Sequence, residues 1–408
     1  MLYDLHELQR AFLSPFVAFT DTSSRLFTDP YNPLSYTPMA RSIAATYDLV
    51  HRLGKDYEKP AWGLSCTQVD GATVPVTENV VANLPFCRLV HFRRQLPEGR
   101  TPDPRILLVA PLSGHHATLL RDTVRTLLPR HEVFVTDWVD ARMVEQNAGC
   151  FGLNDYIHYV QTFIRHLDGN AHVMAVCQPT APVLAAIALM ASNDEPCLPR
   201  SMIMMGGPID ARQSPTQVNR LAMNKPYSWF ENNLIDRVPG RFPGMGRRVY
   251  PGFLQHAGFV AMNPDRHLQS HYDYFLSLLQ GDGQDAEAHR RFYDEYNAVL
   301  DMPAEFYLDT IRIVFQEYEL ARGGLRVNGQ RVDPTAIRNV ALFTIEGELD
   351  DISGQGQTQA AHALCTAIPD ELRQHYTAPD CGHYGIFAGR RWRELICPRI
   401  ENFIRHVA

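Results

Sequence analysis

The chain has 408 residues, of which 45% are hydrophobic and 20% are charged, values that are ordinary for a soluble globular protein. Its formal net charge of -7 at pH 7 argues against a nucleic-acid-binding protein, because such proteins are usually basic. No apolar stretch reaches the length of a membrane span, and Asp4 and Glu7 stand where a secretory signal would carry Lys or Arg, so we expect a cytoplasmic protein without membrane insertion.

Residues 1–100 are predicted to form an N-terminal extension that packs on the core. Leu5, Leu8 and Phe12 recur at helical spacing, which indicates an amphipathic helix near the start of the chain. The prolines of the stretch FTDPYNPLSYTP, which follows, are typical of a loop. Because the pattern changes only after this part of the chain, we place the first domain boundary at its end.

Strands alternate with helices from residue 101 onward. Short apolar runs bounded by turn residues predict buried strands, and runs with helical spacing predict the helices between them. The predicted strands are 106–110, 131–138, 172–176 and 201–205, and the predicted helices are 118–128, 154–167 and 182–191. This alternation is typical of βαβ units with a mostly parallel sheet and helices on both faces. Residues 101–207 therefore form the first part of a predicted α/β core.

The alternation stops at the stretch GGP and resumes about 130 residues later. Residues 208–335 are rich in proline, methionine and aromatic residues and predict a helical lid inserted into the core. Strands are predicted again at 339–347 and 372–377, followed by a C-terminal helix. Residues 336–408 therefore complete the core, and the predicted architecture is an α/β-hydrolase fold with a helical lid.

Cys177 lies at the turn between a predicted strand and a predicted helix. The chain has eight scattered cysteines without a CxxC pair, which we expect to be reduced thiols. Cys177 differs from the others because open parallel sheets bind ligands at the carboxyl ends of their strands. A strand that enters a helix through a sharp turn is typical of a nucleophile elbow, whose helix N-terminus favours an anion. On local sequence alone, a buried structural cysteine remains an equal alternative.

Two other residues favour the catalytic interpretation. Asp350 comes just past the end of one predicted strand, and His383 lies in a glycine-flanked loop after the last one. Nucleophile, acid and histidine thus follow the chain order of α/β-hydrolases. We predict a triad of Cys177, His383 and Asp350. Asp351 and Asp380 are rival acids, but the first would point away if Asp350 points inward, and the second is very near His383 in sequence.

Backbone N–H groups are predicted to stabilise an oxyanion beside this triad. Gln178, directly after Cys177, supplies the first N–H at the start of a helix. The second comes from the loop after the strand at 106–110, with Leu112 or Ser113 as the donor. These two loops leave neighbouring parts of the same sheet edge in the predicted fold.

The adjacent pair His115 and His116 raises the question of a metal site. No third ligand stands at the usual spacing, so we predict no metal, and a helix start or a pocket lining explains the two histidines better. The predicted chemistry needs no cofactor.

The chain resembles the intracellular poly(3-hydroxybutyrate) depolymerases of bacteria over nearly its whole length. The stretches that carry the resemblance are MLYDLHELQRAFLSP, LSGHHATLLRDTV, TDWVDAR, AVCQPTAPVLAA, GELDDISGQGQT and CGHYGIFAGRRWRE. This family is similar to α/β-hydrolases and to polyester synthases, and it uses Cys in place of Ser as the nucleophile. The resemblance implies that Cys177, Asp350 and His383 form the family's triad.

One feature departs from the general hydrolase pattern. The nucleophile elbow usually reads G-x-S/C-x-G, whereas Ala175 and Pro179 replace the two glycines here. Glycine at these places permits a close approach of helix and strand, while Pro179 fixes the first helical turn. Because the CQP form itself resembles this family, we interpret the departure as a subfamily feature.

The resemblance predicts hydrolysis of ester bonds in poly(3-hydroxybutyrate) through a thioester acyl-enzyme. Aromatic residues of the lid are expected to line a groove for the apolar polyester or to touch a storage granule. The candidates are Tyr227, Trp229 and Phe230, with Phe253 and Phe259 as further ones. Packing inside the lid explains any single one of them equally well.

Two other functions fit the same residues. A synthase-like or coenzyme A-dependent acyl transferase would use the same triad, and a non-catalytic granule-binding protein would retain it without activity. The expected partner is the surface of a polyester granule in the cytoplasm, with no nucleic acid, and the sequence leaves a homo-oligomer open.

Overall fold

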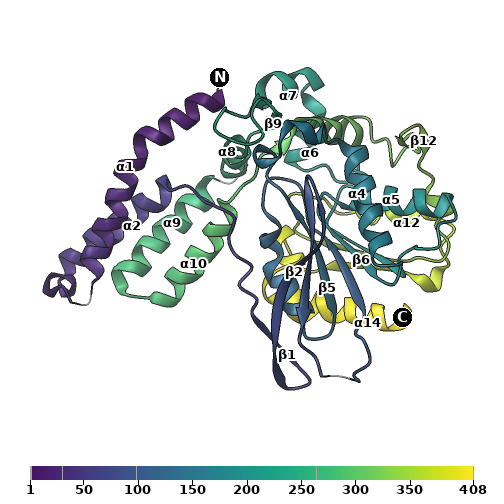
Figure 1. The fold of residues 1–408 in the computed structure, drawn as a ribbon, viewed down its shortest axis with the longest axis horizontal. Helices are drawn as coiled ribbons and strands as arrows, with labels where there is room; N and C mark the ends of the chain where they lie inside the picture. Colours follow the sequence, from purple (N-terminus) through teal and green to yellow (C-terminus); the bar gives the residue numbers. More distant parts are fainter. Residues whose placement is uncertain (1, 30, 98, 263, 408) are drawn as a thin grey trace.

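The computed structural model describes residues 2–29, 31–97, 99–262 and 264–407. Within these residues nine strands form the main sheet, in the order β1-β2-β3-β5-β4-β6-β7-β13-β14 (Figure 1). Its strands are β1 (Cys66–Val69), β2 (Ala72–Leu84), β3 (Cys87–Arg94), β4 (Arg105–Val109), β5 (Glu132–Trp138), β6 (His172–Val176), β7 (Ser201–Met205), β13 (Ala341–Gly347) and β14 (Arg373–Ala378).

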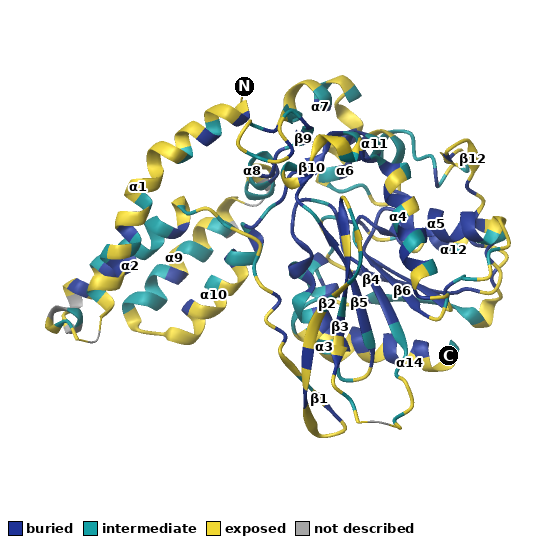
Figure 2. Cartoon of the chain, viewed as in Figure 1, coloured by how far each residue is buried: buried dark blue, intermediate teal, exposed yellow. Residues whose placement is uncertain are grey.

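Neighbouring strands from β5 to β14 run parallel, whereas β1, β2 and β3 are antiparallel and join the sheet through β3 and β5. All residues of β6, β7 and β13 are buried, as expected for parallel strands covered on both faces (Figure 2). The exchange of β4 and β5, the antiparallel entry and the insertion after β7 define an α/β-hydrolase fold. The predicted fold class is confirmed.

Helices cover both faces of the main sheet. On one face α4 (Leu153–His166) packs along α5 (Thr180–Ser192), and on the other α3 (Arg121–Leu127) lies near α14 (Cys397–Val407). Residues 180–190 of α5 are all buried, which explains why this helix is apolar all round. The short helices of the core are η2 (Ala117–Leu120), η3 (Ala141–Met143), η4 (Gln146–Ala148), η6 (Pro334–Ala336), α12 (Ala361–Leu364), η7 (Asp370–Leu372), η8 (His383–Ile386), α13 (Gly389–Arg391) and η9 (Trp392–Ile396).

The segment predicted as an N-terminal extension divides into two parts. Its first part forms α1 (Leu2–Thr28), η1 (Pro33–Tyr36) and α2 (Pro38–Gly54). Its second part, residues 66–94, forms β1, β2 and β3 of the main sheet, so the sheet begins well before the expected boundary at residue 101. Sequence analysis did not predict these three strands.

The lid expected at 208–335 lies between β7 and β13 and is mostly helical. It contains α6 (Gln217–Asn224), α7 (Tyr227–Leu234), α8 (Gly252–Met262), α9 (Pro264–Gln280), α10 (Gly283–Tyr296), α11 (Ala304–Asp309) and the π-helix η5 (Thr310–Gln316). It also contains the short strands β8 (Asp236–Arg237), β9 (Arg248–Tyr250), β10 (Met302–Pro303), β11 (Arg326–Val327) and β12 (Gln330–Arg331). The helices α9 and α10 lie beside α1 and α2, and these four form a helical arm next to the sheet (Figure 1).

A buried polar contact fixes the start of α1 to this insertion. The Tyr3 hydroxyl donates to Oδ2 of Asp301 at 2.6 Å, and the Gly252 N–H donates to the other oxygen of the same carboxylate at 2.8 Å. Burial and the Asp301 charge raise the pKa of Tyr3, so its hydroxyl stays protonated and available as a donor. The Tyr3 N–H also donates to Asp236 at 2.9 Å. The arm is therefore tied to β8, to the start of α8 and to the residue before β10.

Replacing Tyr3 by Phe should loosen α1, because the buried Asp301 carboxylate loses a donor. We expect a loss of about 1–3 kcal/mol in the free energy of unfolding and faster hydrogen exchange of the α1 amides. The measurements are urea denaturation and hydrogen exchange read by mass spectrometry. Tyr31→Phe, at a position that is 95% exposed, is the matched control and should change neither. Equal α1 exchange in both variants would contradict the anchoring role of Tyr3.

Candidate active site

The turn after β6 holds Cys177 in an unusual backbone conformation. Its φ is +68°, in the left-handed region that residues with a side chain rarely adopt. Its N–H donates to the carbonyl of Met205 at 2.7 Å, and its carbonyl accepts from the N–H of Thr180 at 3.2 Å. The turn is therefore sharp and held at both ends, as in a nucleophile elbow. It leaves the Cys177 side chain half-buried at the carboxyl edge of the sheet.

Two glycines after β7 make this turn possible. A Cβ on Gly207 would lie 2.0 Å from Oγ1 of Thr180 and 2.2 Å from the Cys177 carbonyl oxygen, so no larger residue fits without a shift of the backbone. The close approach that glycines within the elbow usually permit thus comes from the neighbouring strand. This accounts for the absence of glycine at positions 175 and 179. From the sequence, the GGP stretch was interpreted only as the point where the alternation of strands and helices stops.

Asp350 and His383 come together beside Cys177. Nδ1 of His383 donates to Oδ2 of Asp350 at 2.8 Å, and the side chains are 5% and 1% exposed, respectively. The other Asp350 oxygen accepts from the N–H groups of Ile352 and Ser353 at 2.9 and 2.8 Å. The Cys177 side chain lies near enough to His383 to raise the pKa of the imidazole, and Nε2 is the ring nitrogen that Asp350 leaves free to face it.

Backbone contacts join the acid loop to the histidine loop. The Leu349 N–H donates to the Cys381 carbonyl at 2.9 Å. Gly206, whose φ is +53°, lies against both loops, because a Cβ there would stand 3.3 Å from Oδ2 of Asp350 and 3.5 Å from Cε1 of His383. The ends of β6, β7, β13 and β14 thus hold the three predicted triad residues in one place.

The two rival acids lie outside this cluster. Asp351 is exposed, although it directly follows Asp350. Asp380 is also exposed, and its carboxylate lies 3.9 Å from Nη2 of Arg391. Among the described residues, Asp350 is the acid that hydrogen-bonds His383.

Two neighbouring groups govern the protonation of His383. Burial by itself lowers the pKa of the His383 imidazole, whereas the Cys177 thiolate and the Asp350 carboxylate raise it through their charges and hydrogen bonds. The net result is a pKa of His383 well above the ordinary histidine value, so the imidazolium is favoured at neutral pH. This environment suits a thiolate–imidazolium pair.

The predicted oxyanion donors lie on two adjacent loops. Val109 at the end of β4 pairs with Ala175 near the end of β6, so the loop carrying Leu112 and Ser113 leaves the sheet next to Cys177. Within the described part of the chain, the N–H groups of Gln178, Leu112 and Ser113 have no hydrogen-bond acceptor. These N–H groups are therefore free to receive a ligand oxygen.

The insertion covers the loop after β4. The Leu300 N–H donates to the Gly114 carbonyl at 2.7 Å, and the Phe259 ring of α8 stacks on His115 with a centroid separation of 4.8 Å. Gly114 has a φ of +110°, and a Cβ there would lie 2.6 Å from Oε1 of Gln255. Of the aromatic residues predicted in the lid, Phe259 contacts the loop of the candidate oxyanion donors.

The two histidines of that loop are buried. Nε2 of His115 contacts the Tyr296 carbonyl at 3.2 Å, and His116 begins η2. Burial lowers the pKa of His115 to about 4 and that of His116 to about 3, so both are neutral at pH 7. Across the described ranges, no three His, Cys, Asp or Glu side chains form a group that could hold a metal ion.

The three aromatic residues predicted to bind substrate lie elsewhere. Phe230 is 1% exposed and packs with Leu308 inside the insertion, so it offers no surface to a substrate in this conformation. Tyr227 and Trp229 are partly exposed beside it, and the Trp229 ring meets the Phe230 ring edge-on at 5.1 Å. None of the three has a contact with Cys177, His383 or Asp350 among the interactions of the described residues.

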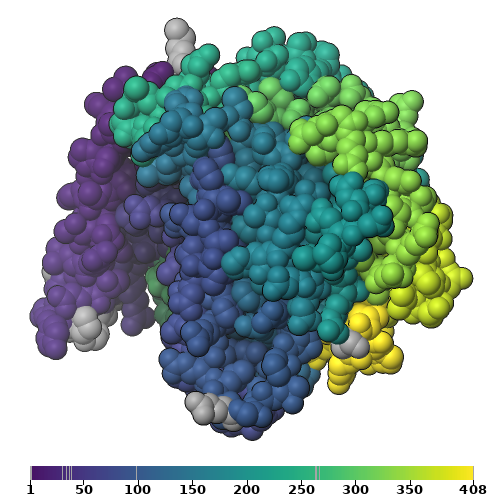
Figure 3. Space-filling model, turned by 45° about the vertical axis from the view of Figure 1, so that its right-hand side comes forward, coloured from purple at the N-terminus to yellow at the C-terminus, as the bar shows by residue number. Residues whose placement is uncertain are grey.

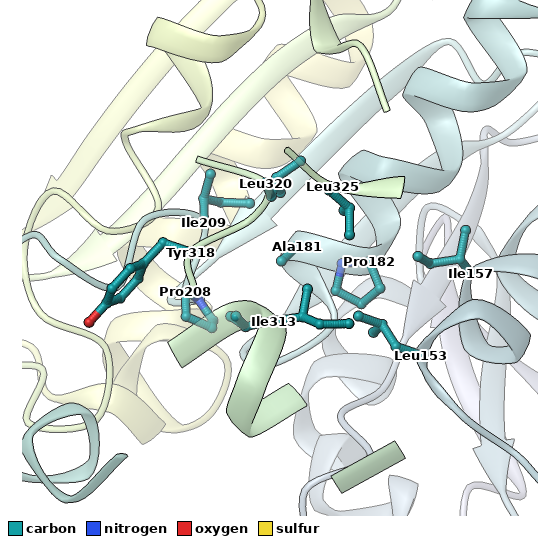
Figure 4. A pocket seen from close by; sticks show the side chains of 11 residues that line it. Leu153, Ile157, Ala181, Pro182, Pro208, Ile209, Ile313, Tyr318, Leu320 and Leu325 are labelled. Atoms are coloured by element: carbon teal, nitrogen blue, oxygen red, sulfur yellow. The ribbon is translucent and has the colours of Figure 1, made fainter. Parts of the chain in front are cut away.

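An apolar pocket lies beside the first turn of α5 (Figure 4). Ala181 and Pro182 form its floor, and Ile313 of η5 faces them from the insertion. Its lining consists of Leu153, Ile157, Ala181, Pro182, Pro208, Ile209, Ile313, Val314, Tyr318, Leu320 and Leu325. None of the three predicted triad residues lines this pocket, so its position does not assign it a role in the reaction.

No helix in the described ranges combines the length and apolarity needed to span a membrane.

The fold and this site together define an enzyme of the α/β-hydrolase class. Residues 206–408, from the glycine after β7 to the end of the chain, match the family described as PHB de-polymerase C-terminus. The C-terminal region of the chain is similar to this family, and the match supports a carboxylic ester hydrolase.

Solved structures of other hydrolases are similar to the chain at low identity. A 2-hydroxy-6-oxo-6-phenylhexa-2,4-dienoate hydrolase from Rhodococcus is 10% identical, with a TM-score of 0.45 over 81% of this chain and 99% of that one. A meta-cleavage product hydrolase from Pseudomonas fluorescens is 12% identical, with a TM-score of 0.44 over 84% and 98%. A thermophilic esterase from Thermogutta terrifontis is 13% identical, with a TM-score of 0.41 over 81% and 98%. A search of curated protein sequences gave no match.

Replacing Gly207 by Ala should distort the Cys177 turn. The added Cβ overlaps the Cys177 carbonyl and Oγ1 of Thr180, and we expect a loss of about 3 kcal/mol in the free energy of unfolding. Gly258→Ala in α8 is the matched control, because a Cβ there meets no atom within 4 Å. The control should be neutral or stabilising by up to about 1 kcal/mol in urea denaturation. Equal stabilities for the two variants would refute the close-packing argument.

Replacing Asp350 by Asn should lower the pKa of His383. The charge of Asp350 and its hydrogen bond raise the pKa of His383. Without them, only Cys177 opposes burial, which lowers that pKa. An NMR titration of labelled histidine measures the change, and we expect kcat to fall by about 10²–10⁴-fold. Asp351→Asn removes an adjacent exposed charge and should alter neither quantity. An unchanged His383 titration in the Asp350 variant would contradict this electrostatic description.

Proposed function

We propose that the chain hydrolyses the ester bonds of poly(3-hydroxybutyrate), with Cys177 as nucleophile, His383 as acid and base, and Asp350 as the residue that orients the histidine. The observation that carries this proposal is the buried hydrogen bond between Asp350 and His383 next to a cysteine held at a left-handed turn, whose charge raises the pKa of the histidine. The family match over residues 206–408 supports the polyester as the substrate.

In the proposed resting site the Cys177 proton already lies on Nε2 of His383, which gives a thiolate–imidazolium pair. The thiolate attacks the ester carbonyl, and the N–H groups of Gln178 and of Leu112 or Ser113 hold the oxyanion. When the intermediate collapses, the C–O bond breaks, and His383 protonates the departing hydroxyl end of the polymer. The acyl group then remains on Cys177 as a thioester.

Deacylation uses the same residues in the opposite sense. His383 removes a proton from a water molecule, whose oxygen attacks the thioester carbonyl. The C–S bond breaks, the thiol recovers its proton from the imidazolium, and a 3-hydroxybutyrate monomer or oligomer leaves as the acid. No cofactor takes part in either half of this reaction.

Replacing Cys177 by Ala should reduce release of 3-hydroxybutyrate from amorphous polymer by at least about 10³-fold, because no thioester can form. Cys150→Ala, which removes an exposed thiol, is the matched control and should retain the parent rate. Mass spectrometry of the parent enzyme, quenched during turnover, should find a 3-hydroxybutyryl group on Cys177.

Degradation by the Cys177 variant at the parent rate, with folding verified by circular dichroism, would refute the mechanism. Release of 3-hydroxybutyryl-coenzyme A in place of the free acid, when coenzyme A is added, would instead favour an acyl transferase. A parent protein that binds the polymer without degrading it would identify a granule-binding protein.

A further inference from the structure

Helix α1 exposes an unusual amount of apolar surface. Of the 21 large hydrophobic side chains that are exposed among the described residues, eight lie on this one helix. Phe12 is 84% exposed, and Phe16 and Phe19 are 55% and 57% exposed. Contiguous apolar surface of this kind marks an interaction site more often than a chance exposure.

These side chains lie on one side of the helix. The α1 face consists of Leu5, Leu8, Phe12, Phe16, Phe19 and Leu26. Their spacing of three, four and seven residues places them together, opposite the buried residues Tyr3, Glu7, Thr20 and Ser24. From Leu5 to Leu26 the face is about 32 Å long at 1.5 Å per residue. Figure 2 shows that most of α1 is exposed along its length, and Figure 3 shows the N-terminal segment along one flank of the molecule.

The charges of α1 lie away from this face, and its arginines are paired. The partners are not all within α1: Arg10 pairs with Glu7 and with Asp56, which lies beyond α2, whereas Arg25 lies 2.9 Å from Asp21 of the same helix. A helix that binds an anionic membrane usually has many Lys and Arg residues on its polar side. The α1 helix has two arginines, both paired, in a chain of net charge -7, so its chemistry fits an uncharged surface.

A second copy of the chain fits this face poorly. Leu5, Phe12, Phe19 and Leu26 are seven residues apart, as at one position of a coiled-coil heptad. A coiled coil also needs an apolar residue three positions after each of these. Those positions hold Leu8, Pro15 and Thr22, so only the first is a large apolar residue. A flat apolar surface, which does not need to interlock with the side chains of α1, fits this face better.

The N-terminal end of α1 is linked to the candidate active site through a series of contacts. This end is tied by Tyr3 to Asp301, whose other oxygen accepts from Gly252 at the start of α8. The same helix α8 carries Phe259, which stacks on His115 of the candidate oxyanion loop. The first turn of α1 is therefore connected through α8 to the loop of the candidate oxyanion donors.

We propose that the α1 face binds the uncharged, apolar surface of the polyester itself and so holds the enzyme on its insoluble substrate. This inference rests on the proposed function, because it takes the polymer as the occupant. It differs from that function in assigning adsorption to residues that touch no catalytic group.

The test compares the full-length parent with the triple variant Leu8→Gln, Phe12→Gln, Phe16→Gln. Each protein is sedimented with amorphous poly(3-hydroxybutyrate) particles, and its rate on a soluble p-nitrophenyl ester is measured in parallel. We expect the triple variant to adsorb about 100-fold more weakly, since three large apolar side chains lose their burial, and to keep the soluble-ester rate. The matched control Leu221→Gln, Met223→Gln, Met245→Gln alters apolar residues that are 47–59% exposed elsewhere and should adsorb like the parent.

Several outcomes would overturn the proposal. One is equal adsorption of parent and triple variant, and another is a parent that does not adsorb at all. A parent that is dimeric by analytical ultracentrifugation, with a monomeric triple variant, would assign the face to a second copy. Stronger binding to phosphatidylglycerol vesicles than to polymer, abolished by 0.5 M salt, would assign it to a membrane. A parent that adsorbs through α1 without hydrolysing the polymer would refute the proposed function and leave the α1 proposal standing.

Discussion

The close packing of a glycine backbone against the Cys177 turn is the constraint on which the candidate site depends. Cys177 keeps a left-handed conformation because its N–H is bonded to the Met205 carbonyl and because Gly207 leaves room for its own carbonyl. Gly206, one residue earlier, lets Asp350 and His383 approach the same point. These two glycines thus allow Cys177, His383 and Asp350 to come together.

The sequence was sufficient for the parallel strands of the main sheet and for the cluster around Cys177, because both leave local signals. Strands buried on both faces are continuous apolar runs, and β6, β7 and β13 are entirely buried. Residues just past the ends of such strands must lie at one edge of the sheet. The chain order of Cys177, Asp350 and His383 could therefore be interpreted before any contact between them was known.

The other elements left no such signal. Strand β2 has one face in water and alternates buried Val74 and Val76 with exposed neighbours, so a search for continuous apolar runs does not detect it. The helical arm joins α2 to α9 across more than 200 residues, and no local pattern encodes that contact. Phe230 illustrates the same difficulty at a single residue, because an aromatic residue on a short helix has the same sequence signature whether it lines a groove or packs a core.

The electrostatics of the site explain why a thiol suits it better than a hydroxyl. A serine nucleophile needs a neutral imidazole as its base, whereas a thiolate is stable beside an imidazolium. Here Asp350 raises the pKa of His383, and both of its oxygens accept hydrogen bonds, one from His383 and the other from the N–H groups of Ile352 and Ser353. Because His383 and the Asp350 side chain are almost fully buried, their charges are screened little by water. In the proposed mechanism, this positive charge on His383 lies beside Cys177, the proposed nucleophile.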